Sequence, residues 1–328
     1  MKDLRVLTVG MFLLLRIGYC NGQSPLFTLD NEICISETVA IQNQSTDVNQ
    51  YFWDFCLDDI ELGVIANSTP LTIGAILNAS DLWIGQDQGN WFGFIVSNQT
   101  NELFRLDFGE DLLSTPTATN LGNPSSLLDR PGRLDIIQIN NNWYGVMGYF
   151  NFGGEFILLD FGSSLENAPS ASSLGNFGLN RTFSSKLVVE NGNILLVVGY
   201  YDGNSIFVAN YGDSFANTPS TVNHSITQLT KPRDISVEKN GADWVVLATT
   251  ELTTNVHEIA FTSLLSTPSS TEVHSISALN NPTTIDVTKE GSQFFALVSN
   301  FSGDASIINF NNLSATPVSI PATNLNRT

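Results

Sequence analysis

Three aspartates, Asp135, Asp234 and Asp286, lie in related stretches of the sequence, each of which follows a proline. These stretches read RPGRLDI, KPRDISV and NPTTIDV, and their prolines are Pro131, Pro232 and Pro282. Carboxylate oxygens are the ligands that Ca²⁺ prefers. If the fold brings the three stretches together, the three aspartates are candidate ligands of one Ca²⁺ ion.

Other polar side chains of these stretches belong to the same expected site. Arg133 and Arg233 lie within two of the stretches, and Gly74 and Ser236 occupy equivalent places. The sequence contains no D-x-D-x-D loop, no G-x-S-x-G, no H-E-x-x-H and no phosphate-binding glycine loop. The sequence therefore predicts no catalytic residues. It also predicts no cofactor, unless the protein binds Ca²⁺.

The three histidines, His224, His257 and His274, offer little support for catalysis. None of them has a nucleophile or a carboxylate at the spacing of a known catalytic motif. We expect them to be ordinary surface histidines.

A repeat of about fifty residues must position these side chains. Five copies of a turn signature end at Pro116, Pro169, Pro219, Pro268 and Pro317, with spacings of 53, 50, 49 and 49 residues. Their sequences are LFRLDFGEDLLSTP, FILLDFGSSLENAP, IFVANYGDSFANTP, VHEIAFTSLLSTP and SIINFNNLSATP. A period near fifty is typical of a propeller blade or of another repeat array.

Each copy contains the strands of one blade. Apolar runs open at Trp91, Trp143, Ile194, Trp244 and Phe294. A turn rich in Gly or Asn precedes each run, as hairpins require. The prolines at 131, 232 and 282 suit the first residue of a strand, where no hydrogen-bond donor is lost. Without helical periodicity, four antiparallel strands in each repeat predict an all-β fold, a β-propeller whose innermost strands carry the aspartates.

A divergent copy precedes the five. Asp54-Phe55-Cys56 aligns with Asp107-Phe108-Gly109, and the spacing from Asp54 to Asp107 is 53 residues, as it is from Asp107 to Asp160. Six copies predict a six-bladed propeller over residues 23–328, with residues 24–72 as the first blade. The hydrogen-bonded hairpin expected there would bring Cys34 close to Cys56.

The same N-terminal stretch resembles a PKD module, an immunoglobulin-like sandwich of exported bacterial proteins. The resemblance rests on NQSTDVNQYFWDFC, although Cys56-Leu57-Asp58 replaces the Gly-Asp-Gly of that family. Taken whole, the chain resembles the repeat region of exported bacterial surface proteins that join PKD modules to a six-bladed propeller of the NHL or TolB-like kind. The shared motifs are structural, and proteins of this kind often carry further adhesive or sorting modules after the propeller. A truncated PKD module remains the alternative to a PKD-like first blade.

The N-terminus predicts export. Lys2 and Arg5 precede the ten-residue apolar run VLTVGMFLLL, which is too short to span a membrane and is followed by small residues. We expect a signal peptide over residues 1–22, with a lipoprotein modified at Cys20 as the alternative. No later segment is apolar enough to span a bilayer. In an oxidising location, Cys34 and Cys56 favour a disulfide over a metal site.

Charge and fold together predict the function. The formal net charge of −19 opposes binding to nucleic acid. A rigid propeller with variable loops suits recognition. We expect a secreted or cell-surface module that binds a glycan, a peptide or another surface protein. The alternatives are a Ca²⁺-dependent propeller hydrolase or lactonase, which Asp286→Asn or chelation would inactivate, and a structural spacer within a larger surface protein.

Overall fold

The computed structural model describes residues 27–28, 42–43, 76–149, 153–290, 293–301, 305–310 and 314–318. The chain divides into two compact units, Met1–Leu57 and Asp58–Thr328. In the first unit, β1 (Phe27–Thr28) pairs antiparallel with β2 (Gln42–Asn43). The predicted signal peptide and the Cys34–Cys56 disulfide lie outside the described residues.

The described residues of the second unit form five four-stranded sheets, which we number as blades 1 to 5. Blade 1 contains β3 (Ala79–Asp87), β4 (Asn90–Ser97), β5 (Glu102–Gly109) and β6 (Thr117–Gly122). Blade 2 contains β7 (Pro131–Ile139), β8 (Asn142–Tyr149), β9 (Phe156–Gly162) and β10 (Ser170–Gly175). Blade 3 contains β11 (Thr182–Glu190), β12 (Asn193–Tyr200), β13 (Ser205–Asn210) and β14 (Ser220–Ser225).

The remaining blades follow the same plan. Blade 4 contains β15 (Pro232–Asn240), β16 (Asp243–Thr250), β17 (Asn255–Phe261) and β18 (Ser270–Ser275). Blade 5 contains β19 (Pro282–Glu290), β20 (Gln293–Asn300), β21 (Ala305–Asn309) and β22 (Ser314–Val318). A short 3-10 helix, η2 (Pro124–Ser126), connects blades 1 and 2. Among the residues described, we find no helix with the length and apolar character needed to cross a membrane.

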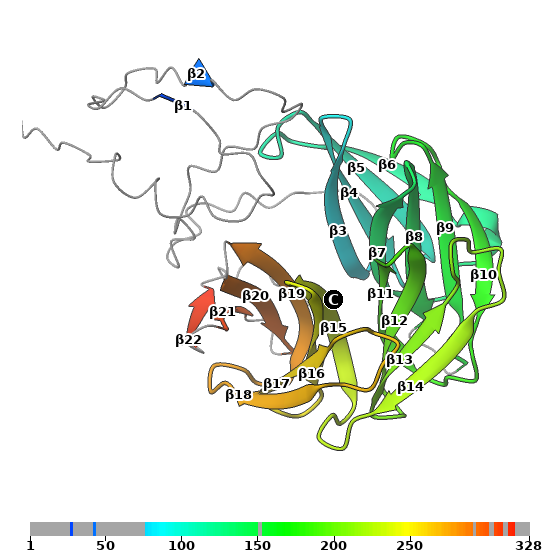
Figure 1. The fold of residues 1–328 in the computed structure, drawn as a ribbon. Helices are drawn as coiled ribbons and strands as arrows, with labels where there is room; N and C mark the ends of the chain where they lie inside the picture. The colour runs from blue at the N-terminus through cyan, green and yellow to red at the C-terminus, as the bar shows by residue number, and fades with distance from the viewer. Residues whose placement is uncertain are drawn as a thin grey trace, which may run out of the picture. The chain divides into compact units, whose positions relative to one another are not determined.

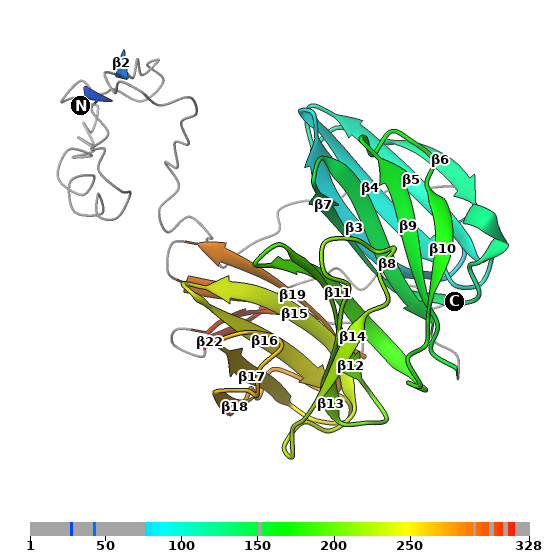
Figure 2. The ribbon, with the colours of Figure 1, turned by 45° about the vertical axis from the view of Figure 1, so that its right-hand side comes forward.

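Every blade is an antiparallel meander whose strands pair in chain order. The first strands of the blades, β3, β7, β11, β15 and β19, surround a common centre, and the last strands lie at the outside (Figures 1 and 2). Three of these innermost strands begin at the predicted prolines, Pro131, Pro232 and Pro282, which confirms that prediction. The chain therefore folds into a β-propeller of four-stranded antiparallel blades.

The predicted number of six blades is wrong for the described structure, which has five. The sixth was inferred from the resemblance of Asp54-Phe55-Cys56 to the Asp-Phe-Gly turn, and these residues lie outside the described ones. Each of the five clear copies of the repeat forms one blade, because each supplies four strands that pair in chain order.

The Asp-Phe-Gly signature proves to be a turn in which a side chain replaces a backbone acceptor. In blade 2 the backbone N–H of Gly162 donates to Asp160 Oδ1 at 2.8 Å, and Gly162 has a φ of +66°. The same bond joins Gly109 to Asp107 in blade 1 and Gly212 to Asn210 in blade 3. The positive φ explains why glycine recurs at this place.

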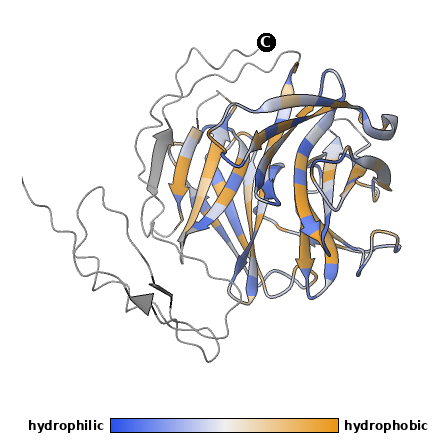
Figure 3. Ribbon diagram, turned by 90° about the horizontal axis from the view of Figure 1, so that it is seen from above, coloured by the Kyte–Doolittle hydropathy of each residue, from blue (hydrophilic) through white to orange (hydrophobic). Residues whose placement is uncertain are grey.

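Apolar side chains fill the space between successive blades. In innermost strands such as β15 and β19 apolar residues alternate with polar ones, because neighbouring residues point to opposite faces of a sheet. Strands in the middle of a blade, such as β12, are apolar on both faces and buried over most of their length. Figure 3 shows the hydrophobic and hydrophilic stretches of the blades. Separate buried clusters join blade 1 to 2, 2 to 3, 3 to 4 and 4 to 5. Burial of this apolar surface is the main stabilising contribution to such a fold.

The junction between blade 5 and blade 1 differs from the other four. Within the described residues, no buried cluster joins these two blades. Leu82 and Ile84 of β3 remain 50% and 42% exposed, and Leu297 of β20 remains 48% exposed. In the other innermost strands the equivalent positions, such as Leu134 and Ile285, are buried against the preceding blade. We call this junction the seam.

Candidate active site

A cavity of about 530 Å³ lies at the centre, where the innermost strands of all five blades meet. Seven ionisable side chains line it: Asp81, Arg133, Asp135, Lys186, Asp234, Glu238 and Asp286. The exposed apolar residues of the seam, Leu82, Ile84 and Leu297, line it as well. The cavity is therefore rich in carboxylates and has an apolar wall beside the seam.

Strand alternation explains which residues reach the cavity. In β15 Asp234, Ser236 and Glu238 are separated by single residues and so project from the same face of the strand. Ile235, between them, is fully buried in the cluster that joins blades 3 and 4. One innermost strand thus contributes to the apolar core with one face and to the cavity with the other.

Two of the aspartates join consecutive blades. Asp81 Oδ2 of blade 1 accepts the backbone N–H of Leu134 in blade 2 at 2.8 Å. Asp135 Oδ2 of blade 2 accepts the backbone N–H of Leu187 in blade 3 at 2.8 Å. We call these contacts junction hydrogen bonds: a side chain on one innermost strand accepts a backbone N–H from the innermost strand of the next blade.

The next two junctions use the same arrangement. Ser184 Oγ of blade 3 accepts the backbone N–H of Ile235 in blade 4 at 3.0 Å and donates to Asp234 Oδ1 at 2.6 Å. Asp234 Oδ2 accepts the backbone N–H of Ile285 in blade 5 at 3.0 Å. Because a buried N–H without an acceptor is costly, Asp81, Asp135 and Asp234 all have a clear structural function.

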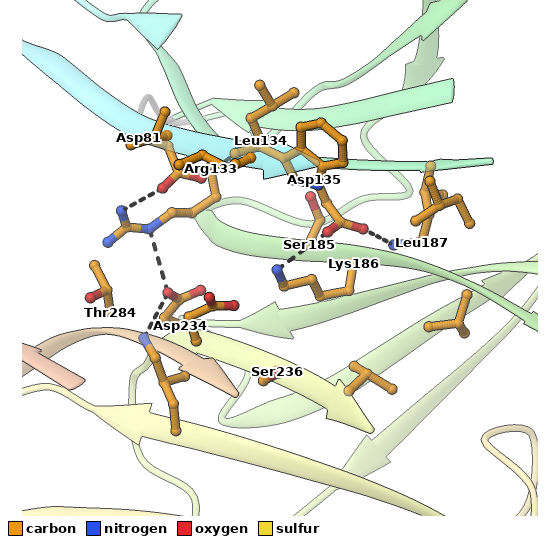
Figure 4. Close-up of a pocket in the computed structure, with 18 of the residues that line it drawn as sticks. Asp81, Arg133, Leu134, Asp135, Ser185, Lys186, Leu187, Asp234, Ser236 and Thr284 are labelled. Atoms are coloured by element: carbon orange, nitrogen blue, oxygen red, sulfur yellow. Dashed lines mark hydrogen bonds and ion pairs between the residues drawn. The ribbon is translucent and has the colours of Figure 1, made fainter. Parts of the chain in front are cut away.

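Arg133 extends from blade 2 across the cavity (Figure 4). Its Nη1 donates to the carbonyl oxygen of Ser80 at 3.0 Å, and its Nη2 donates to that of Thr283 at 2.9 Å. Its guanidinium also lies 3.5 Å from Asp81 Oδ1 and 3.8 Å from Asp234 Oδ2. Arg133 therefore connects β3 with β19 across the seam while balancing two carboxylates.

Lys186 is the second cation of the cavity. Its Nζ lies 3.3 Å from Asp135 Oδ1. A dashed line marks this ion pair in Figure 4. Burial disfavours its charge, but the surrounding carboxylates of Asp135, Asp234, Asp286 and Asp81 outweigh burial and raise the pKa of Lys186 above its usual value. Lys186 is thus firmly held as a cation in the midst of the acidic residues.

At Asp81, whose side chain is 22% exposed, burial outweighs the neighbouring charges. Loss of hydration raises the pKa of Asp81 to about 6, although Arg133 and the N–H of Leu134 both favour the charged form. Asp234, a second negative charge nearby, adds to the increase. Asp81 is therefore a carboxyl group that changes its charge close to neutral pH.

Glu238 and Asp286 are the two cavity carboxylates that take no part in junction hydrogen bonds. Glu238 Oε1 accepts a hydrogen bond from Ser236 Oγ at 2.8 Å. Burial raises the pKa of Glu238, and the negative charges of Asp286 and Asp135 add to this increase. Asp286 is exposed to the cavity, because the seam leaves its side of β19 uncovered. These two carboxylates are the ones available to a ligand.

The sequence located some of these residues and missed others. Arg133, Asp135, Asp234, Ser236 and Asp286 line the cavity together, as expected of the innermost strands. Arg233 instead stacks on the ring of Phe183 at 4.9 Å, and Gly74 lies outside the described residues. Glu238 was missed although it lies two residues beyond Ser236, a period-2 signal that would have placed it on the same face.

Lys186 and Asp81 were missed for a different reason. Their strands, β3 and β11, lack the proline that begins β7, β15 and β19, so aligning the repeats on that proline does not identify these two residues. Aligning the Gly or Asn turn after each innermost strand would have placed Lys186 in register with Asp135. The distance between these two residues in the chain is 51, one repeat.

The predicted Ca²⁺ site at Asp135, Asp234 and Asp286 stays a prediction. In the described structure Asp135 is paired with Lys186, and Asp234 lies beside Arg133. The described residues contain one group of three His, Cys or acidic side chains with ligand atoms within 4.8 Å of one another, and it lies outside the cavity.

The prediction that all three histidines lie at the surface is wrong for two of them. His224 and His257 are buried, with exposed fractions of 5% and 2%. His224 Nε2 lies 2.9 Å from the carbonyl oxygen of Leu264, so the ring joins blade 3 to the neighbouring loop of blade 4.

Comparison with known proteins gives a fold. No family model and no curated protein matches the sequence. Solved structures do match: a thermostable family-43 glycoside hydrolase has a TM-score of 0.52 at 11% identity, over 77% of this chain and 96% of the other. An exo-β-1,3-galactanase from Phanerochaete chrysosporium, solved with galactose, has a TM-score of 0.53 at 10% identity, over 74% and 63%. At such identities the likeness establishes the propeller fold alone.

These comparisons correct two predictions. The two matching structures named above are glycoside hydrolases, so the resemblance to PKD and NHL or TolB-like surface proteins is contradicted. The predicted binding module is contradicted by the same finding. The physical reason lies in the repeat, because its recurring motifs encode strands and turns that propellers of unrelated function share.

Proposed function

We propose that this chain is a glycoside hydrolase that acts in the central cavity, with Glu238 as the general acid and Asp286 as the second carboxylate. Hydrolysis of a glycosidic bond commonly uses two carboxyl groups on opposite sides of the bond. One donates a proton to the departing oxygen. The other activates water or attacks the anomeric carbon.

Glu238 suits the role of the acid. A general acid must still carry its proton near the working pH, which requires a pKa above that of an ordinary carboxyl group. Burial raises the pKa of Glu238, and the negative charge of Asp286 acts in the same direction. Ser236, which donates to Oε1, holds the carboxyl group in one orientation.

Asp286 suits the role of the second carboxylate. It lies on β19, next to the β15 strand that carries Glu238, and it is exposed to the cavity. Asp81, Asp135 and Asp234 are less suitable because each already accepts a backbone N–H. The observation that carries the proposal is this division of the cavity carboxylates into three that join blades and two that remain available.

The fold comparisons support a glycan as the substrate. The exo-β-1,3-galactanase that shares the propeller was solved with galactose. In this chain the apolar wall of Leu82, Ile84 and Leu297 faces the same cavity as the carboxylates, an arrangement that suits a sugar ring with one apolar face. We further propose that the enzyme acts outside the producing cell, as the predicted signal peptide over residues 1–22 would require.

The test is the hydrolysis of aryl glycosides and of β-1,3-linked galactose oligosaccharides by the full chain. We expect turnover by the wild type and a decrease in kcat/KM of about 10²- to 10⁴-fold for both Glu238→Gln and Asp286→Asn, because each removes a group that transfers a proton or activates the nucleophile. Glu110→Gln, an exposed substitution in blade 1, is the control and should retain full activity.

The pH profile adds a second criterion. The basic limb of kcat/KM should follow Glu238, whose pKa is raised by burial, so Glu238→Gln should lose this limb in the activity that remains. Absence of turnover on every glycoside, or variants that keep the wild-type rate with an unchanged melting temperature, would overturn the proposal.

A further inference from the structure

Blade 4 carries a cluster of two glutamates and a histidine on its outer strands. Glu258 lies on β17, and Glu272 and His274 lie on β18. One ligand atom from each side chain lies within 4.8 Å of the other two, and His274 Nε2 is 2.8 Å from Glu258 Oε2. The cluster lies outside the central cavity and takes no part in the proposed hydrolysis.

Strand register holds the three side chains on one face. Glu258 and Glu272 are direct partners in the antiparallel pair of β17 and β18. His274 lies two residues beyond Glu272 and so projects from the same face. Both strands are fixed by their ladder of hydrogen bonds, so the cluster is preorganised by the sheet.

The electrostatics of the cluster are unbalanced. Like charges directly opposite each other on neighbouring strands are destabilising. His274 lies against Glu258, whereas Glu272 has no hydrogen bond or ion pair to another described residue. The chain as a whole carries a formal charge of −19, so its average field adds to the repulsion. A bound cation would compensate both carboxylates together.

The other blades show that the repeat does not require this cluster. At the place of the Glu258 and Glu272 pair, blade 3 has Val208 opposite Val222, and blade 2 has Leu158 opposite Ser172. Blade 3 also has a histidine at the place of His274, because His224 pairs with Ile206 as His274 pairs with Val256. Without the two glutamates, His224 serves as a buried contact to the carbonyl oxygen of Leu264.

We propose that Glu258, Glu272 and His274 bind a divalent transition-metal ion of the Zn²⁺ class. An imidazole nitrogen together with two carboxylate oxygens is a ligand set that Zn²⁺ accepts, and a water completes the tetrahedron. Ca²⁺ and Mg²⁺ prefer oxygen ligands alone. The exposed Glu272 provides the path of entry. The Phe310 ring packs edge-to-face against the imidazole, with 5.9 Å between the ring centroids, and orients His274. The ion would tie β18, the last strand of blade 4, to β17.

The test is calorimetric titration of the full chain, freed of metal by a chelator, with Zn²⁺ and separately with Ca²⁺ and Mg²⁺ at neutral pH. We expect one equivalent of Zn²⁺ to bind with an increase in melting temperature, and neither Ca²⁺ nor Mg²⁺ to compete. Co²⁺ bound in place of Zn²⁺ should show the intense visible absorption of a tetrahedral site.

Glu272→Gln is the decisive variant, because its side chain is exposed and its fold should be unaffected. We expect it to weaken Zn²⁺ binding at least tenfold and to abolish the gain in melting temperature. Glu110→Gln removes an exposed glutamate elsewhere and should bind Zn²⁺ as the wild type does. Absence of stoichiometric Zn²⁺ binding, or equal affinity in Glu272→Gln and the wild type, would overturn the proposal.

Discussion

The carboxyl group of Asp81 is held between the backbone N–H of Leu134 and the guanidinium of Arg133, yet it is largely removed from water. Both partners stabilise the ionised form, but the loss of hydration has the greater weight and raises the pKa to about 6, compared with 3.8 for an ordinary aspartate. A residue that joins two blades is thereby also sensitive to pH.

We expect Asp81 to make the fold less stable as the pH rises from about 4 to about 6. In this range the folded state binds more protons than the unfolded chain, so the free energy of unfolding falls with pH, by up to about 3 kcal/mol from this group. Asp81→Asn keeps an oxygen for the Leu134 N–H but does not ionise, so it should lack this contribution.

Urea unfolding of both proteins at pH 4 and pH 7 measures the effect. Relative to the wild type, Asp81→Asn should be more stable at pH 7 than at pH 4. A difference that does not change with pH would contradict the raised pKa.

At the scale of the element, the Asp-Phe-Gly turn ends the third strand of the first two blades, and Asn-Tyr-Gly does so in blade 3. Gly162 is typical: its φ of +66° is one that side chains with a Cβ rarely adopt. Blade 4 has Ala260 and Thr262 at the places of the aspartate and the glycine, and Thr262 is not among the residues of positive φ. The same repeat position is therefore built in two ways.

We expect Gly162→Ala to destabilise the fold by about 1 to 2 kcal/mol, because an alanine in the left-handed region is strained. Thr262→Ala at the equivalent place in blade 4 is the matched control and should change stability by less than about 0.5 kcal/mol, as surface substitutions do. Urea unfolding gives both values. Equal losses in the two variants would show that backbone conformation is not the reason for the glycine.

The sequence was sufficient to predict the elements, because each signal behind them is local. Turn glycines, strand-initiating prolines and alternating apolar residues depend on neighbours within a few positions, so the four-stranded blades follow from the repeat. The number of blades and the roles of the cavity residues depend on contacts about fifty residues apart. Thus the sequence could predict that Asp135 and Asp286 lie in one place. It could not show that Asp135 accepts a backbone N–H and that Asp286 does not.

At the scale of the whole molecule, the seam is the junction at which the described residues show the least apolar packing. Where the other junctions have buried clusters, this one has Arg133, which reaches Ser80 in blade 1 and Thr283 in blade 5. The guanidinium suits this role because its donors lie in a rigid plane and point in several directions at once. Within the described ring, the seam thus depends more on polar contacts than the other four junctions do.

We expect Arg133→Met to destabilise the fold by about 3 to 5 kcal/mol, because it leaves the partly buried Asp81 and Asp234 without their cation. Arg233→Met is the matched control. It removes a guanidinium that stacks on Phe183, a contact that contributes about 0.5 to 1 kcal/mol. Chemical unfolding of both variants checks the prediction, and a loss for Arg133→Met no larger than that for Arg233→Met would contradict it.

The junction hydrogen bonds all run in one direction along the chain. In each case the acceptor comes first, and its N–H partner follows 53, 52, 51 or 51 residues later. During synthesis the ribosome therefore releases every acceptor before its donor, and each newly completed blade presents the carboxylate or hydroxyl that the next one will meet. Assembly can proceed from the N-terminal blade onward, one repeat at a time, without waiting for the end of the chain.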